Sequence, residues 1–207
     1  MAPLPQTLAP DTERRIIRIQ ALTLIWMTVE AAVSLGAAWA ARSPALLSFG
    51  GDSAVELLSA AVVLRRFYGR SPEAHAEERA ATIAGALLFV LAAFVILASA
   101  LSLLGLLTEP RPSWVGITLL IFAAVVMPWL AGQKRRLSAA TGSAALRADA
   151  TESAVCGYLA LIALAGLAAN AIWKVSWADP AAALALLPFI LHEGWEAMKG
   201  KPCCDSN

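Results

Sequence analysis

The sequence predicts an all-α membrane protein with six transmembrane helices, and three observations support this fold class. Hydrophobic residues make up 59% of the 207 residues and charged residues only 15%, whereas soluble domains are roughly half apolar. Six apolar stretches are each long enough, at about 20 residues, to cross the hydrocarbon of a bilayer as a helix. The longest polar connection, residues 69–79, is too short to fold alone. We therefore expect the lipid bilayer to be the main solvent of the chain.

The six expected spans follow the order of the apolar runs. They cover Ile19–Ala41, Pro44–Leu64, Ala80–Leu107, Trp114–Gly132, Ala144–Ala169 and Trp177–Met198. The turn TEPRPS separates the third span from the fourth, and the basic run at residues 133–136 marks the end of the fourth. Tryptophans near both ends of the sixth span are typical of an aromatic belt. Residues 16–198 thus form one membrane domain between a flexible cytoplasmic N-terminal tail, residues 1–15, and a cytoplasmic tail, residues 199–207.

The distribution of Lys and Arg predicts the orientation of the chain. Cytoplasmic loops carry the excess of basic residues, and an even number of spans puts both termini on one side. That side holds Arg14, Arg15, Arg18, Arg65, Arg66, Arg70, Arg79, Lys134, Arg135, Arg136, Lys199 and Lys201. The opposite side holds only Arg42, Arg111 and Lys174. We therefore expect both termini to be cytoplasmic. Because the net charge is only +1 and the basic residues lie between apolar blocks, a nucleic-acid partner is not expected.

Two spans carry potential metal ligands at helical spacing. Asp52 and Glu56 are four residues apart in the second span, as are Glu152 and Cys156 in the fifth, so each pair lies on one face of its helix. An acid at the centre of a membrane helix costs roughly 2.5 to 3.5 kcal/mol on insertion scales, which favours a functional role. If the two faces pack together, three carboxylates and a thiolate form a four-coordinate cage suited to Zn²⁺. Metal entry would then release protons.

These pairs resemble the metal-binding motifs of the cation diffusion facilitator, or cation efflux, family. In SPALLSFGGDSAVE, Asp52 and Glu56 match the paired ligands of the family's second helix. In ALRADATESAVC, Glu152 and Cys156 match the ligands of its fifth helix. The segment from Trp177 to Trp195 is similar to the family's sixth helix. The resemblance covers about residues 15–198 and is greatest to the short branch with only the membrane domain, which lacks the cytoplasmic C-terminal domain.

The resemblance implies a homodimeric antiporter that exchanges a divalent metal ion for protons by alternating access, with no tightly bound cofactor. Three of the four matched positions, Glu56, Glu152 and Cys156, differ from the more usual family ligands, and no site histidine remains. A thiolate ligand favours zinc or cadmium, whereas carboxylates alone would suit manganese. Zinc is the transported ion that these ligands favour most.

Other polar residues leave two roles open. Asp149, three residues before Glu152, either supports the ion's ligands from a second layer or pairs with Arg147, and we favour the pairing. Glu30, the lone acid of the first span, either assists the ion or bonds another helix. Three further residues are expected to be solvated surface positions: His75, His192 and Glu193.

The favoured hypothesis is a transporter in the plasma membrane that exports zinc or a related heavy metal from the cytoplasm in exchange for protons. The sequence contains no catalytic triad pattern, nucleotide-binding loop or His-Glu-x-x-His motif, so an enzyme is not expected. One alternative is a membrane metal sensor or chaperone partner, whose main ligands would be Cys203 and Cys204. In a transporter, the same pair of cysteines is at most an accessory metal site in the tail. A third is a structural subunit whose buried acids pair with basic residues of another protein.

Overall fold

The computed structural model describes residues 10–68, 74–107, 109–141 and 144–198, and within these ranges some side chains, including those of Glu56 and Arg147, are not described. The described chain consists of six helices: α1 (Pro10–Ala41), α2 (Pro44–Tyr68), α3 (Ala74–Leu103), α4 (Trp114–Thr141), α5 (Ala144–Trp173) and α6 (Ala178–Met198). The predicted all-α fold with six helices is therefore confirmed.

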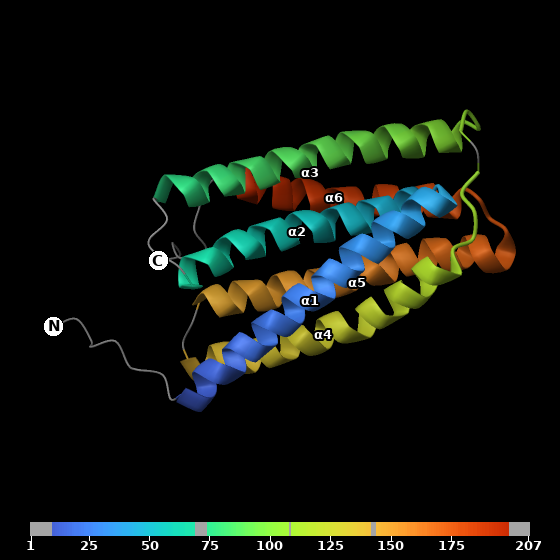
Figure 1. Cartoon of the computed structure of the whole chain (residues 1–207). Coiled ribbons are helices and arrows are strands. Elements are labelled where there is room, and N and C mark those ends of the chain that lie inside the picture. The colour runs from blue at the N-terminus through green and yellow to red at the C-terminus, as the bar shows by residue number, and fades with distance from the viewer. Residues whose placement is uncertain (1–9, 69–73, 108, 142–143, 199–207) are drawn as a thin grey trace.

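The helices form an elongated bundle in which consecutive helices run in opposite directions (Figure 1). The connections after α1, α3 and α5 lie at one end, which we call the turn end. The first residues of α1 and the last residues of α6 lie at the other end, which we call the terminal end. Helix α2 contacts α1, α3, α5 and α6 and is thus the central helix. Its side chains consequently face protein on most sides.

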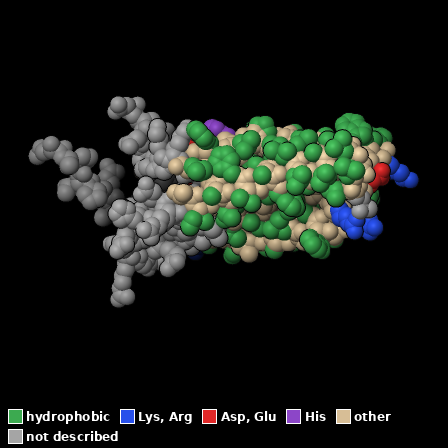
Figure 2. All heavy atoms as spheres, turned by 90° about the horizontal axis from the view of Figure 1, so that it is seen from above, with side chains coloured by type: hydrophobic (Ala, Val, Ile, Leu, Met, Phe, Trp, Pro, Cys, Tyr) green, Lys and Arg blue, Asp and Glu red, His purple; other side chains and the backbone are tan. Residues whose placement is uncertain are grey.

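The outer surface of the bundle is apolar, as a lipid-facing surface must be. Helices α1, α3, α4 and α5 contain stretches long and apolar enough to cross a bilayer: Arg14–Ala41, Gly85–Leu103, Trp114–Thr141 and Asp149–Trp173. Helix α2 lies against α1, α3 and α5, and helix α6 lies against α3 and α5. Hydrophobic side chains cover the sides of the bundle in Figure 2, and the Lys and Arg side chains that this view shows in colour lie mainly at the turn end. The chain is thus an integral, multi-pass membrane protein.

Four exposed tryptophans ring the turn end. Trp39, Trp114, Trp173 and Trp177 come from the ends of α1, α4 and α5 and from the residue before α6, and Trp39 is 89% exposed. Tryptophan prefers the boundary between hydrocarbon and headgroups, because its ring is apolar while its N–H group is polar. These side chains therefore mark where the bundle leaves the membrane.

Several helix boundaries differ from the sequence-based expectation. Helix α3 ends at Leu103 and not at Leu107, because Gly105 adopts a φ of 72° and the Leu106 N–H donates to the Leu101 carbonyl at 2.9 Å, as in a Schellman cap. Helix α4 continues through the basic run to Thr141, since those residues are good helix formers. Helix α1 begins at Pro10, inside the segment expected to be a tail. Residues 1–9 and 199–207 lie outside the described residues.

Asp179 of α6 caps the start of α2 at the turn end. Its carboxylate is fully buried, accepts a hydrogen bond from the Ser43 hydroxyl, and accepts another from the Ala45 N–H at 3.1 Å. The Ser43 Oγ in turn accepts the Leu46 N–H at 3.1 Å. Helix N-terminal N–H groups lack partners within their own helix, so a carboxylate from a neighbouring helix both satisfies them and favourably meets the helix dipole. This contact links the positions of α2 and α6.

Replacing Asp179 with Ala should destabilise the bundle. The change leaves the Ala45 N–H and the Ser43 hydroxyl without their acceptor. Such a loss typically costs about 1 to 2 kcal/mol, so the midpoint of thermal unfolding in detergent should fall by several degrees. Glu109→Ala, at an exposed position in the α3–α4 connection, is the matched control and should leave the midpoint unchanged. An unchanged midpoint for Asp179→Ala would show that this cap does not contribute to stability.

Candidate metal-ion site

Asp52 of the central helix points toward α6 and is only 1% exposed. Its carboxyl group lies beside that of Glu193, and Glu152 of α5 is a further electrostatic neighbour of Glu193. Two adjacent carboxylates repel each other, and a shared proton or a bound dication relieves that repulsion. The expectation that Glu193 is a solvated surface residue is therefore wrong: it is half-buried and belongs to the interior acids. His192, by contrast, is exposed as expected.

The two predicted ligands on α5 point in different directions. Cys156 follows Asp149 by seven residues, so the two lie within about 20° of each other around the helix and face α1 and α4. Glu152 lies beside this stripe, about 40° from Cys156 and about 60° from Asp149 around the helix. Its side chain is exposed, although protein atoms surround most of its carboxyl group. Glu152 is thus an electrostatic neighbour of Asp149 and Lys134 as well as of Glu193, whereas Cys156 contacts Glu30.

Cys156 lies in a second buried cluster, centred on Glu30 of α1. Both side chains are fully buried, and the Cys156 thiol donates to Glu30 Oε1 at 3.4 Å. The Ser53 hydroxyl of α2 donates to the same oxygen at 3.4 Å. The indole of Trp26, one turn earlier on α1, lies beside the Glu30 carboxyl group. This cluster joins α1, α2 and α5.

A third cluster surrounds Asp149 nearer the terminal end. Lys134 of α4 donates to Asp149 Oδ1 at 2.7 Å and to the Ser153 hydroxyl at 2.9 Å, and Gln20 of α1 donates to Asp149 Oδ2 at 2.7 Å. Lys134 and Gln20 are thus partners of Asp149, because the stripe of α5 that carries Asp149 faces α1 and α4. The expected pairing with Arg147 stays a prediction, because the Arg147 side chain is not described. Lys134 is fully buried, which corrects its assignment to a solvated basic run.

Replacing Lys134 with Met should destabilise the protein by leaving Asp149 without its cation. Removing one partner of a fully buried pair costs roughly 3 to 5 kcal/mol. Because Asp149 retains 31% side-chain exposure, we expect a smaller loss, about 2 kcal/mol, in unfolding free energy by denaturant titration in detergent micelles. Adding Asp149→Asn removes the unpaired charge and should recover part of the loss. A double variant less stable than Lys134→Met would contradict this interpretation.

The described residues place the predicted ligands in two neighbouring clusters. Asp52 lies beside Glu193 and Cys156 lies beside Glu30, while Glu152 is an electrostatic neighbour of Asp149, Lys134 and Glu193. Glu56 follows Asp52 by one turn of α2, but its side chain is not described. Among the described side chains, no three His, Cys, Asp or Glu residues are close enough to hold one ion. The four-residue site therefore stays a prediction. Cys203, Cys204 and the side chain of His75 lie outside the described part of the structure.

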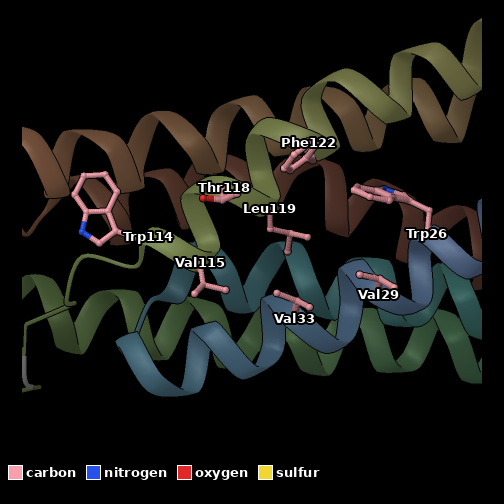
Figure 3. Close-up of a pocket in the computed structure, with 8 residues that line it drawn as sticks. All are labelled: Trp26, Val29, Val33, Trp114, Val115, Thr118, Leu119 and Phe122. Atoms are coloured by element: carbon pink, nitrogen blue, oxygen red, sulfur yellow. The ribbon is translucent and has the colours of Figure 1, made fainter.

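A groove on the outer surface, between α1 and α4, is separate from the acids. Residues Trp26, Val29 and Val33 of α1 and Trp114, Val115, Thr118, Leu119 and Phe122 of α4 line it (Figure 3). It has a volume of about 550 Å³ and contains no titratable side chain. Such a lining suits lipid chains and not a hydrated cation. The Trp26 ring lies at one end of this groove and also beside Glu30.

Helical periodicity could have revealed the two residues that the sequence analysis misplaced. Glu193 follows the buried Leu186 by seven residues, and Lys134 likewise follows the buried Met127. Residues seven apart share a helix face, so both side chains lie on the inward stripe of their helix. Their positions near helix ends had suggested solvent instead.

A multi-pass helical bundle with carboxylates buried at its centre defines a membrane protein of the ion-carrying class. The family model described as the cation efflux transmembrane domain matches residues 21–200, which is most of the chain. The chain therefore belongs to the cation efflux family, a family of metal-cation transporters. No curated protein matches the chain.

Proposed function

We propose that this protein exports zinc or a related divalent heavy metal from the cytoplasm across the plasma membrane, in exchange for protons. The observation that carries the proposal is the buried Asp52 on the central helix, with Glu193 of α6 beside it and Glu152 of α5 nearby. Like charges gathered in a low-dielectric bundle are unfavourable unless a cation or protons neutralise them. Membership of the cation efflux family supports a cation as the neutralising partner.

The proposed ion ligands are Asp52, Glu56, Glu152 and Cys156, with Asp149 acting behind them through Lys134. The seven residues from Asp149 to Cys156 span about 10 Å of α5. The proposed cycle requires a rotation or tilt of α2 against α5 that brings these ligands to one ion. The cycle then alternates between a metal-loaded state and a protonated state, each facing one side of the membrane in turn. Binding of metal releases the protons that neutralise the empty site.

The excess of basic residues at the terminal end supports cytoplasmic termini, since the ends of α1 and α6 lie together there (Figure 1). A homodimer held by membrane helices is part of the proposal. The alternative function is a membrane metal sensor or chaperone partner that binds the ion without moving it. The two differ in a single property, because only a transporter carries metal across a sealed bilayer.

Asp52→Ala should abolish metal transport. Zn²⁺ uptake into proteoliposomes under an imposed pH gradient, followed with a fluorescent indicator inside the vesicles, should fall to the level of protein-free vesicles. The reason is that the variant removes a buried carboxylate from the central helix. Asp52→Asn keeps the shape of the side chain and tests whether charge is required. Uptake equal to that of the wild type would remove Asp52 from the mechanism.

Glu152→Ala should lower the metal content of the purified protein, because it removes one carboxylate from the site. Metal bound per chain, measured by mass spectrometry after equilibration with Zn²⁺, should fall well below the wild-type value. Deletion of residues 203–207 serves as the comparison. If that deletion abolishes binding while Glu152→Ala does not, and if the wild type never moves metal, the sensor function is correct.

A further inference from the structure

Glu30 is a buried carboxyl group for which the proposed four-residue site has no role. It lies within the first span, is 0% exposed, and its Oε1 accepts both the Cys156 thiol and the Ser53 hydroxyl. Its second oxygen, Oε2, receives no hydrogen bond of standard geometry from the described residues. The Trp26 indole lies beside the same carboxyl group, so the described contacts of Glu30 are all neutral donors. A carboxylate held only by neutral donors in a low-dielectric interior is costly, and a bound cation is the simplest reason to keep it.

The spacing of Glu30 and Cys156 suits two ligands of one metal ion. Zn²⁺ binds thiolate sulfur at about 2.3 Å and carboxylate oxygen at about 2.1 Å, and tetrahedral geometry then places the two donors about 3.6 Å apart. The observed separation of Cys156 Sγ and Glu30 Oε1 is 3.4 Å. An ion could therefore replace the thiol proton between these atoms with little movement of either helix.

Close packing holds α1 and α2 together beside this pair. A Cβ atom on Gly50 of α2 would collide with the Ser34 side chain, which lies one turn after Glu30 on α1. The absence of a side chain at Gly50 thus allows the approach that puts Ser53 against Glu30. The Trp26 indole, which also lines the outer groove, lies beside the carboxyl group (Figure 3). Glu30 is thus held in place from three helices.

We propose that Glu30 is a further ligand of the transported ion, acting together with Cys156, so that the ion site extends onto α1. One hard oxygen and one soft sulfur on the same ion select for borderline and soft dications, such as Zn²⁺ and Cd²⁺, over Mg²⁺ or Ca²⁺. This inference rests on the proposed function and assigns to Glu30 a part in its specificity.

The test is Cd²⁺ binding by isothermal titration calorimetry, using full-length protein in which Cys203 and Cys204 are replaced by Ser so that tail thiols do not contribute. Glu30→Gln keeps the size of the side chain and an oxygen acceptor for the Cys156 thiol, but loses the charge. Loss of even an outer-layer partner weakens metal binding roughly 10- to 100-fold, so Glu30→Gln should weaken Cd²⁺ binding at least that much. Glu109→Gln, at an exposed position, is the matched control and should bind as the parent does.

A double-variant cycle tests whether the two residues hold the same ion. If they do, Glu30→Gln combined with Cys156→Ser should weaken binding by less than the product of the separate losses. Independent losses that multiply, or Glu30→Gln affinity within twofold of the parent, would overturn the inference. If Glu30→Gln fails to fold, Glu30→Asp replaces it, because it keeps the charge but shortens the side chain by one methylene. Glu30→Asp should then weaken Cd²⁺ binding, and an unchanged affinity would overturn the inference.

The outcomes separate this inference from the proposed function. If Asp52→Asn and Cys156→Ser weaken binding while Glu30→Gln does not, the transport site stands and Glu30 is only a hydrogen-bond acceptor for the thiol. If the parent protein binds no Cd²⁺ or Zn²⁺ at all, the proposed function itself fails.

Discussion

Lipid offers no hydrogen bonds and little screening, so every polar group within this bundle must find its partner inside the protein. The interior acids obey this constraint by gathering on the helices that pack around α2. Asp149 is neutralised by Lys134, while Glu30 accepts the thiol of Cys156 and the hydroxyl of Ser53. Asp52 of α2 and Glu193 of α6 lie beside each other. The need to neutralise them connects the architecture to cation transport.

The turn end and the interior are mechanically linked through α2. Asp179 of α6 caps the start of α2, so that the two helices share a fixed relation at that end. Further along, the same two helices carry Asp52 and Glu193 to one point. Movement of α6 would therefore change the position of Glu193 relative to Asp52. Such coupling is what alternating access demands of a helix pair, because the ion's surroundings must change when the bundle rocks.

The Lys134–Asp149 pair adds a cation of the protein's own close to the site. Lys134 is also an electrostatic neighbour of Glu152, and therefore offsets part of the negative charge near the ion's path. A fixed ammonium group lowers the attraction of the site for any cation, which helps release as much as it hinders binding. A transported ion must be held firmly enough to enter and loosely enough to leave, so a compensating charge fits a carrier better than a storage site.

Much of the fold can be predicted from the pattern of residues along the sequence. Apolar length alone predicts six membrane-crossing helices, and the four-residue spacing of Asp52 with Glu56 and of Glu152 with Cys156 marks two helices as carriers of ligands. The sequence could not decide which face of each helix meets which neighbour, because that depends on how six rods rotate to fill space together. Only tertiary packing turned Lys134 and Glu193 inward and placed Glu30 against a thiol 126 positions away. The spacing of residues determines which side chains share one helix face. The packing of the neighbouring helices determines which residues that face contacts.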